Sequence, residues 1–412
     1  MRQIIASLDL GSSKIKLVVA ELKEEGLNIL CAIDEESRGI QHGEIIEVDD
    51  TVYAIKKLLK KEEDLLGIKI SKVIVNISEA NTQYKIGEAS IIVGEVETEI
   101  LASDIVRVLQ TSVKGNLDKD YDLITVVPVM FKVDDRKTRI PRGLKGKSLS
   151  VKSVIITSPK RDIYMAAKVL EKCGLEVVDI MTPSIGSYFA HKNESTDTET
   201  GVVIDCGAET FNVSVVNKGI VINTTVLNIG GVDIDKDLSY VYKLTTEQAH
   251  GLKNDLALAH KKNASQGEKE SLVNTNGEKI IVNQEEVTNI VMSRCHEMLN
   301  MAKSEINYLT KKEISYIIIT GGLTELRDFS IEVESIFGRL ANVGKIQIVG
   351  ARDNKYAVCV GMIKYFDSKL RLRDKEYSSI SADDEEILSG ASEKKNTGES
   401  ILGKVFGIFF DN

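Results

Sequence analysis

Two short segments of the chain share a pattern that suits phosphate chemistry. In each, a strand-like apolar run ends in an aspartate, one further residue and a glycine, and a second strand-like run follows about five residues later: LDLGSSKIKLVVAELKEEG carries Asp9 and Gly11, and IDCGAETFNVSVVNKG carries Asp205 and Gly207. The backbone N–H groups and small side chains of such a turn wrap phosphate oxygens, while the aspartate holds a magnesium ion through water. One such turn is a weak signal, because an ordinary hairpin with a glycine at positive φ has the same sequence.

The elements around these turns alternate between strand and helix signals. The two turns lie 196 residues apart, which predicts two halves of one ancestral plan. Helical periodicity in DDTVYAIKKLLKKEEDLLG and a strand-like KISKVIVNIS follow the first turn. All four prolines fall between residues 128 and 183. Together with the turn-like RGLKGKS they predict a small inserted α+β module at roughly 82–160.

Composition limits the classes of function. With 412 residues, 42% of them hydrophobic and 28% charged, the chain is long enough for two or three domains. A net charge of -9 and no visible basic stripe argue against nucleic acid as a partner. The five cysteines are scattered without a CxxC pair, which predicts neither a disulfide framework nor a zinc site and fits a reducing cytosol. The N-terminus has no signal-peptide core, and no apolar run approaches the roughly 20 residues that span a bilayer.

Further segments follow the second turn in a fixed order. They are NIGGVDIDKDL, the helical TTEQAHGLK, ISYIIITGGLTELRDF and NKYAVCVGMIKYF. This order resembles the phosphate, connecting and adenosine segments of the actin, Hsp70 and sugar-kinase ATPase superfamily. Within it, the chain is similar to the FtsA family of bacterial cell-division proteins over residues 1 to about 370. The inserted segments VVPVMFKVDD and LKGKSLSVKSVIITSP, and CGLEVVDIMTPSIGSYFA after them, are typical of that family and not of actin or Hsp70.

The resemblance implies an α/β fold of the two-lobed actin/Hsp70 type, with a small inserted α+β (SHS2-like) module and a C-terminal amphipathic helix. The charged run from about Arg371 to Glu399 has almost no periodic apolar residues and is expected to be a flexible linker. The expected divisions are a first lobe at 1–81 with 161–195 and about 345–370, the module at 82–160, a second lobe at 196–344 with an outer subdomain at about 226–305, the linker at 371–398, and a membrane-targeting helix at 399–412.

The resemblance also implies an ATP site with Mg²⁺, in which Asp9 and Asp205 hold the metal through water. The resemblance assigns nucleotide-binding residues to five parts of the family's site. They are the first phosphate loop (Asp9, Gly11, Ser12, Ser13 and Lys14), the second loop (Asp205, Gly207 and Thr210), the glycine pair after it (Gly230 and Gly231), an adenosine-contacting lysine (Lys253) and the adenosine motif (Gly321 and Gly322).

The second loop departs from the family pattern. Where the family usually has a Gly-Thr-Thr-Asp run, this chain has Glu209, Thr210, Phe211 and Asn212. A glutamate held at the positive φ of a loop glycine costs roughly 1 kcal/mol and brings a negative charge toward the triphosphate. Asn212 removes a carboxylate that could hold the metal or orient the attacking water. His250 stands where the family usually has a glutamate near the nucleoside. We therefore expect weakened ATP binding, no assigned catalytic residue and at most a slow ATPase.

One helical segment is a candidate partner surface. In EEVTNIVMSRCHEMLNMAKSEINYL, apolar residues recur at helical spacing, which predicts a buried stripe on one face of a helix. By the resemblance, Arg294 in this segment corresponds to an arginine in the FtsA subdomain that receives the FtsZ C-terminal peptide, where it would form a charge-assisted hydrogen bond. A charged residue on a helix is more often simply solvated. The stripe comprises Val287, Ile290, Val291, Met298, Met301 and Ile306.

The last segment, SILGKVFGIFFDN, follows a polar stretch and is strongly apolar. At about 100° per residue one arc carries only apolar residues, while Ser400, Gly403, Lys404, Gly407 and Asp411 occupy the other. This predicts an amphipathic helix lying in a membrane surface, the alternative being a tail docked on the body or on a partner. The apolar arc comprises Ile401, Leu402, Val405, Phe406, Ile408, Phe409 and Phe410.

Taken together, the resemblance implies a protein that forms filaments on the cytoplasmic face of the cell membrane at the division septum. It would tether the FtsZ ring there and recruit later division proteins. Three alternatives stay open: a sugar or acetate kinase, an Hsp70-like chaperone and a pilus-assembly ATPase. A kinase needs an intact second loop, and a chaperone needs a β domain where only about 40 residues follow. The pilus-assembly relatives share the inserted module and are the closest competitor.

Overall fold

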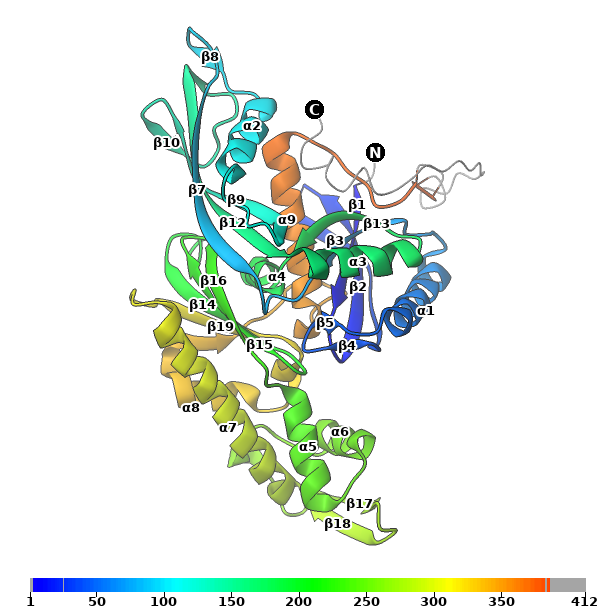
Figure 1. Ribbon diagram of the computed structural model, residues 1–412. Coiled ribbons are helices and arrows are strands. Elements are labelled where there is room, and N and C mark those ends of the chain that lie inside the picture. Colours follow the sequence, from blue (N-terminus) through cyan, green and yellow to red (C-terminus); the bar gives the residue numbers. More distant parts are fainter. Residues whose placement is uncertain (1–2, 25, 382–383, 386–412) are drawn as a thin grey trace. The chain divides into compact units, whose positions relative to one another are not determined.

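The computed structural model describes residues 3–24, 26–381 and 384–385 (Figure 1). These residues divide into two units. The first contains the described parts of Met1–Ala190, Ile348–Ala351 and Cys359–Asn412, and the second contains His191–Gln347 and Arg352–Val358. Each unit is built around one five-stranded sheet.

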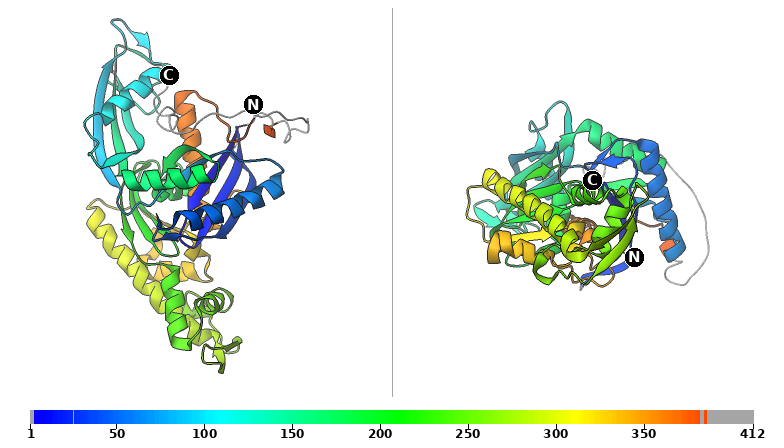
Figure 2. Two further views of the ribbon diagram at one scale, coloured as in Figure 1. Left: turned by 45° about the vertical axis from the view of Figure 1, so that its right-hand side comes forward. Right: turned by 90° about the horizontal axis from the view of Figure 1, so that it is seen from below.

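The sheet of the first unit has the strand order β13-β6-β1-β2-β3. β1 has the sequence IIASLDL and is buried along its whole length, as expected for a central strand covered on both faces. Helices α1 and α3 pack on one face, while α4 and α9 pack together on the other (Figures 1 and 2). The elements are β1 (Ile4–Leu10), β2 (Lys14–Lys23), β3 (Gly26–Glu36), β4 (Ile40–Gln41), β5 (Glu44–Ile45), α1 (Val48–Leu66), β6 (Lys72–Asn76), α3 (Lys160–Lys172), β13 (Glu176–Met181), α4 (Pro183–His191) and α9 (Ala357–Arg373).

An inserted module lies between β6 and α3 in the sequence. Its sheet has the order β10-β9-β12-β7, and helix α2 packs on one face over a small core that includes Phe131, Val133 and Leu149. Near α2, residues at the start of β12 and at the end of β9 alternate between that core and the opposite, more exposed face, while the second half of β12 is buried throughout. The elements are β7 (Gln83–Ile92), β8 (Thr98–Glu99), α2 (Ala102–Val113), β9 (Tyr121–Val133), β10 (Arg136–Thr138), β11 (Lys145–Gly146) and β12 (Ser148–Pro159).

The sheet of the second unit has the order β16-β15-β14-β19-β20. Its elements are β14 (Thr200–Cys206), β15 (Phe211–Asn217), β16 (Ile220–Leu227), α5 (Gly231–Tyr242), α6 (Thr246–Asp255), η1 (Lys261–Asn263), β17 (Lys269–Val273), β18 (Lys279–Asn283), α7 (Gln284–Leu309), β19 (Tyr316–Thr320), η2 (Gly322–Glu325), α8 (Phe329–Phe337), η3 (Gly338–Leu340), β20 (Ala341–Val343) and η4 (Asn354–Tyr356).

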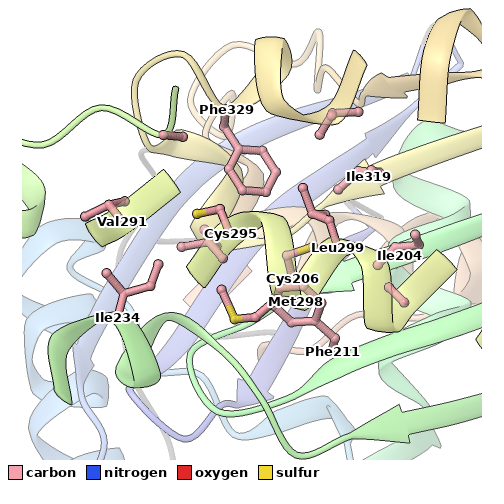
Figure 3. Packing of buried hydrophobic residues seen from close by; sticks show 14 of the residues in the cluster. Ile204, Cys206, Phe211, Ile234, Val291, Cys295, Met298, Leu299, Ile319 and Phe329 are labelled. Carbon is pink, nitrogen blue, oxygen red and sulfur yellow. The ribbon is translucent and has the colours of Figure 1, made fainter. Parts of the chain in front are cut away.

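Helix α7 supplies much of the core of the second unit (Figure 3). Its Val291, Cys295, Met298 and Leu299 lie among side chains from the sheet, such as Phe211. The expected stripe on this helix is confirmed for Val287, Val291, Met298 and Ile306, and Ile290 is partly buried. The expectation for Met301 is wrong, because its side chain is 40% exposed on the outer face of the helix.

The two five-stranded sheets have the same topology. In each, the first two connections form antiparallel pairs, β1-β2-β3 and β14-β15-β16, and the next strand lies parallel to the first, β6 beside β1 and β19 beside β14. A last parallel strand, β13 or β20, completes the order. The repeat expected from the two Asp-x-Gly turns is therefore confirmed, and each turn joins the first two strands of its sheet.

The folded body continues past residue 370, where the sequence led us to expect a linker. α9 runs to Arg373, and Leu372 packs against the core of the inserted module. The Ser379 N–H then donates to Ile4 O (2.6 Å), and Ala6 N–H donates to Ser379 Oγ (3.0 Å). The apolar residues of this polar run are spaced too irregularly for a helix pattern, but Tyr377 packs edge-on against Phe366 of α9 and Ile380 is buried. The expected helix at 399–412 lies outside the described residues.

Candidate functional site

The first Asp-x-Gly turn is a tight connection between β1 and β2. Asp9 lies directly opposite Lys16 in the antiparallel register. The Asp9 carboxylate accepts hydrogen bonds from Asn76 Nδ2 (2.6 Å) and Lys16 Nζ (2.8 Å), and it is 5% exposed. A side chain at Gly11 would place its Cβ 2.7 Å from Lys14 O, so the turn requires glycine. The turn thus presents a buried carboxylate with a buried cation beside it.

The cation at this turn is Lys16, which the sequence-based assignment missed. The Lys16 ammonium lies 3.1 Å from where a Cβ on Gly11 would be, and its side chain is largely buried. Lys14, named as the loop lysine, instead lies 3.7 Å from Asp34 on β3 with a more exposed side chain. The antiparallel register supplies the missing signal, because Leu10 pairs with Ile15 and this pairing places residue 16 opposite residue 9.

The two serines of the turn are held by neighbouring backbone. Gly43 N–H, from the connection between β4 and β5, donates to Ser12 Oγ (2.9 Å). Ser37 N–H donates to Ser13 O (2.9 Å). Because Ser12 accepts the first of these bonds, its own hydroxyl hydrogen can be donated to a ligand oxygen. The turn is therefore fixed before any ligand arrives.

The second turn, between β14 and β15, repeats the geometry of the first. Gly207 N–H donates to Thr210 O (2.9 Å), and a Cβ on Gly207 would lie 2.8 Å from that carbonyl oxygen. Asp205 lies opposite Asn212 in the register, as Asp9 lies opposite Lys16. The chemical difference is that the second turn has a neutral amide where the first has an ammonium.

Glu209 does not have the strained backbone expected of it. Among the described residues, those other than glycine with positive φ are His42, Asp134, Lys218, Lys243, Asp328 and Asp374, and Glu209 is not one of them. The glycine of this turn, Gly207, makes the close approach to Thr210, so residue 209 accepts a side chain. The expected strain is therefore wrong, while the negative charge of Glu209 beside the turn remains.

The glycine pair that follows packs the second turn onto helix α5. Gly231 N–H donates to Gly207 O (3.1 Å), and Val232 N–H donates to Ala208 O (2.8 Å). Gly230 N–H is capped by the Asp233 carboxylate (2.9 Å). The first N–H groups of α5 are thus used by the turn itself. Gly230 and Gly231 therefore position the turn. The N–H groups of residues 230–232 already donate within the protein and are not available to a phosphate.

Lys253 is buried beside this helix start. Its ammonium donates to Gly231 O (3.1 Å) and lies 2.8 Å from an Asp235 carboxylate oxygen, with 6% of the side chain exposed. The other Asp235 oxygen lies 2.9 Å from His250 Nδ1, whose side chain is half exposed. Asp235, on α5, is a member of the site that sequence reasoning missed. Asp235 follows Gly231 by one helical turn, and this spacing could have indicated that its side chain lies near the glycine pair.

The carboxyl ends of the parallel strands β14 and β19 meet at Asp205. Asp205 and Thr320 are register partners, and His191 Nε2 lies 2.8 Å from Thr320 Oγ1. Gly321 has φ +94°, and a Cβ there would lie 2.4 Å from Asp205 Oδ1. Ligands of open α/β sheets bind at such carboxyl ends, where strand order reverses. Gly322 begins η2 immediately after this contact.

Each unit thus presents its own set of expected residues. The first unit brings together Asp9, Gly11, Ser12 and Ser13 with Lys16 and Asn76. The second brings together Asp205, Gly207 and Thr210 with the glycine pair, Lys253, Gly321 and Gly322. No group of three or more His, Cys, Asp or Glu side chains that could hold a metal occurs in the part of the chain that the structure describes. A magnesium ion at Asp9 or Asp205 would therefore need waters and phosphate oxygens as its other ligands.

Arg294 lies on α7 and is engaged within the second unit. Its Nε and Nη2 donate to the two oxygens of Asp237 on α5 (2.7 and 2.8 Å), and Nη1 donates to Glu297 (2.7 Å). The Asp237 hydrogen bonds raise the pKa of Arg294 above its ordinary value. The side chain is still 32% exposed.

None of the described helices is long and apolar enough to cross a membrane. Two family models match the chain: "Cell division protein FtsA" at residues 202–361 and "SHS2 domain inserted in FTSA" at residues 81–157. Together they span more than half of the sequence. The second match coincides with the inserted module of β7 to β12.

Individual proteins show the same relationship. The cell division protein FtsA of Bacillus subtilis (strain 168) is 25% identical over 378 residues, which are 91% of this chain and 86% of that protein. Among solved structures, MreB5 of Spiroplasma citri bound to ADP has a TM-score of 0.56 at 12% identity, covering 90% of this chain and 97% of that one. A PilM-PilN type IV pilus biogenesis complex has a TM-score of 0.57 at 12% identity, covering 87% and 97%. At these identities the two structures show a shared actin-like fold.

Proposed function

The chain belongs to the FtsA family of cell division proteins, and we propose that it binds ATP, forms filaments on the cytoplasmic face of the cell membrane and tethers the FtsZ ring there at the septum. Later division proteins would be recruited to the same assembly. The observation that carries the nucleotide part is the repeated turn, which places Asp9 and Asp205 at equivalent sheet positions. The similar fold of an MreB bound to ADP supports it.

The rival functions are less well supported. A sugar or acetate kinase needs a catalytic carboxylate in the second turn, where this chain has Asn212 opposite Asp205. A PilM-like role shares the fold. However, the inserted module matches the model of the domain inserted in FtsA, and this match favours division over pilus assembly.

The residues present fit a triphosphate with Mg²⁺ better in the first turn than in the second. When bound, Mg²⁺ would shield the charge of the phosphates. In the first unit, Asp9 would hold it through water, and Lys16 and Ser12 would donate to phosphate oxygens. In the second unit, Asp205 is the equivalent carboxylate for holding the ion through water. Gly230, Gly231, Lys253, Gly321 and Gly322 would shape the nucleoside side of the site in the second unit. The carboxylate of Glu209 and the neutral amide of Asn212, which stands where the first turn has an ammonium, weaken binding at the second turn.

Slow turnover is the first expected result. Purified protein should hydrolyse ATP at a rate well below about 1 per second, the low end of ordinary enzymes. The reason is that Asn212 supplies no carboxylate to orient water, and Glu209 repels the phosphates. Phosphate release measured at saturating ATP and Mg²⁺ tests this. A turnover above that rate would show that another group performs the role of the missing carboxylate.

Lys16 and Lys14 are expected to differ in their effect on nucleotide affinity. Lys16→Met should weaken binding of a fluorescent ATP analogue by roughly 10- to 100-fold, because a charge-assisted hydrogen bond contributes about 1.5–3 kcal/mol. Lys14→Met should change affinity by less than about threefold, since a partly exposed pair of this kind contributes little. Titration with and without Mg²⁺ measures both.

Two controls accompany the lysine variants. Lys16→Met leaves the buried Asp9 carboxylate without its ammonium partner, so its thermal unfolding must be compared with that of the intact chain. Lys16→Arg keeps the positive charge and should retain most of the affinity if charge is what matters. Equal losses in the Lys14 and Lys16 variants would contradict the assignment of Lys16 to the phosphates.

Arg294 is expected to contribute to binding of the FtsZ C-terminal peptide. Arg294→Glu should lower the affinity for this peptide at least tenfold while costing about 1 kcal/mol of stability, because the ion pair with Asp237 is partly exposed. Asp237→Ala is the matched control, since it breaks the same ion pair but keeps the arginine charge. Fluorescence anisotropy of a labelled peptide distinguishes the two. If Asp237→Ala binds as weakly as Arg294→Glu, the arginine acts only through helix packing.

Recruitment of FtsZ to lipid tests the function as a whole. FtsZ is mixed with vesicles, ATP and the full-length chain, and the pelleted FtsZ is measured. We expect FtsZ to pellet with vesicles only when the chain is present, and FtsZ lacking its C-terminal peptide to remain in the supernatant. If this chain brings down no FtsZ although it pellets with lipid itself, the tethering role is wrong.

A further inference from the structure

The charges of the inserted module are strongly segregated along the sequence. Between residues 132 and 152 there are eight lysines and arginines but only two acidic residues, Asp134 and Asp135, in a chain whose net charge is -9. This stretch runs from the end of β9 through β10 and β11 into β12. The cations are Lys132, Arg136, Lys137, Arg139, Arg142, Lys145, Lys147 and Lys152, which we call the basic segment.

Two of these lysines face each other across neighbouring strands. Lys132 on β9 and Lys137 on β10 are register partners in an antiparallel pair, so their side chains lie on the same face. That face is the exposed one, because Phe131 and Val133 on either side of Lys132 point into the core under α2. Neither lysine forms an ion pair with any described residue. Like charges in this arrangement are destabilising, and the fold itself gives no reason to keep them.

Asp134, in the turn between β9 and β10, is directed toward the backbone. Asp134 accepts hydrogen bonds from Lys147 N–H (3.1 Å) and from the N–H and hydroxyl of Ser148 (2.9 and 3.0 Å). These bonds lower the pKa of Asp134, so it stays ionised as a structural group of the hairpin. Other carboxylates, Glu95, Glu97 and Glu99, lie on the connection through β8, and Glu99 is opposite Lys145. On the outer face itself, Glu88 of β7 forms an ion pair with Lys152 (2.9 Å) and offsets one cation of the basic segment, which leaves Lys132 and Lys137 as the excess positive charge.

Exposed aliphatic side chains accompany the cations. Ile140, in the loop after β10, is 73% exposed between Arg139 and Arg142 in sequence. Ile92 at the end of β7 is 78% exposed, and Val96 just before β8 is 71% exposed. β8 and β10 lie at the same end of the module (Figure 1). Aliphatic side chains among cations suit a lipid headgroup region, whereas single-stranded nucleic acid is bound by stacking on aromatic rings.

The basic segment lies close to the start of the polar run that leads to the apolar tail at residues 400–412. Arg142 Nη1 lies 2.6 Å from Asp374 Oδ1, directly after α9, so the basic segment touches the start of the C-terminal polar run. From Glu385, where the described residues end, fifteen positions lead to Ser400 at the start of the apolar tail. Such a stretch spans at most about 50 Å when fully extended. A tail lying in a membrane would therefore hold the first unit close to the lipid surface.

We propose that the basic segment forms a second membrane contact, in which its cations bind anionic phospholipid headgroups and Ile140 enters the interface. The choice of a membrane over an acidic peptide rests on the proposed function of membrane tethering. This contact supplies the attraction to anionic lipid that the tail lacks, because the tail itself carries a single lysine, Lys404. The tail then provides the apolar anchor, and the module makes binding depend on lipid charge.

Vesicle sedimentation of the full-length chain tests the second contact. Vesicles of phosphatidylcholine alone are compared with vesicles that also contain phosphatidylglycerol. The double variant Lys132→Gln, Lys137→Gln should bind the anionic vesicles roughly 25-fold more weakly, since each cation near such a surface contributes about fivefold. It should bind neutral vesicles like the intact chain. Thermal unfolding should occur at the same temperature or higher, because a like-charge pair has been removed.

A matched control removes two cations from another exposed hairpin. Lys269→Gln with Lys279→Gln changes β17 and β18 of the second unit and should leave binding to both kinds of vesicle unchanged. Equal binding of the intact chain to neutral and anionic vesicles would overturn the second contact. So would lysine variants that bind anionic vesicles as tightly as the intact chain, the result expected if the segment served an acidic protein instead.

The tail variant Phe406→Asp separates this inference from the proposed function. If only the tail assignment fails, Phe406→Asp pellets like the intact chain, while the lysine variants still lose binding to anionic vesicles. If only the second contact fails, Phe406→Asp loses binding to all vesicles and the lysine variants behave like the intact chain. Each idea can therefore be contradicted without the other.

Discussion

Replacing Gly321 by alanine is expected to destabilise the second unit by about 2–4 kcal/mol and to abolish detectable nucleotide binding. The backbone at Gly321 has φ +94°, and an alanine Cβ would lie 2.4 Å from Asp205 Oδ1 and 2.6 Å from Cys206 O. Relief requires β19 and β14 to separate, and the Asp205 carboxylate to turn away from the added methyl group. Chemical unfolding and titration of an ATP analogue measure the two effects.

Gly322→Ala is the matched control for this prediction. The next residue along the chain has only Lys355 Cβ near its hypothetical side chain, at 3.8 Å, and it begins the short helix η2. Its replacement should change stability by less than about 1 kcal/mol, because an added Cβ meets no close neighbour. If Gly321→Ala behaved like Gly322→Ala, the contact with Asp205 would not constrain the site.

The duplicated architecture could be predicted from the sequence because each half begins with the same local signal. An apolar strand, an aspartate and a glycine turn fix a hairpin, and two such hairpins 196 residues apart indicate a repeat. The structure adds the parallel strands β6 and β19 beside them, which place Asn76 and Thr320 next to the two aspartates. Nothing in a strand's own sequence identifies its neighbour, so Asn76 could not be assigned from local pattern.

The errors in the site have the same origin. Lys14 and Lys16 are both near Gly11 in sequence, and only the antiparallel register places Lys16 opposite Asp9. Applied to the second turn, the same register shows that Asn212 takes the place of Lys16. The sequence alone had led us to interpret Asn212 as a lost carboxylate. The structure adds that Asn212 supplies a neutral amide at the position where the first turn has the ammonium of Lys16, a further reason to expect weak phosphate binding.

The C-terminal boundary of the body was misjudged for a different physical reason. A run rich in charged and small residues is typical of a linker. Here, Ser379 is fully buried because its backbone and hydroxyl bond to the N-terminal end of β1. A segment can thus be held by hydrogen bonds to an existing strand and by one or two apolar residues, such as Ile380. No periodic pattern is needed for this, and periodicity is the only signal that the sequence offers.

Loss of the apolar tail is expected to have the largest effect on membrane binding. Phe406→Asp places a charge in the middle of the apolar arc predicted for residues 401–410, and a chain ending at Asn396 lacks the arc altogether. An apolar side chain of this size contributes roughly 1.5–3 kcal/mol to the free energy of membrane binding when it is fully buried. Even with partial burial, the substitution should lower the affinity for vesicles at least tenfold. Both variants should remain in the supernatant when neutral vesicles are pelleted.

Ser400→Asp is the control, because it adds the same charge on the opposite, polar arc and should pellet like the intact chain.

A single tail should bind the membrane reversibly. Ordering a short helix with two glycines costs free energy, and this cost offsets part of the gain from burying its apolar side chains. Linking many tails along a filament raises the effective affinity by orders of magnitude, so polymerisation would control anchoring. Binding should then rise steeply with protein concentration, above the threshold for filament assembly. A Phe406→Asp protein that pellets as well as the intact chain would show that the tail docks on protein, not on lipid.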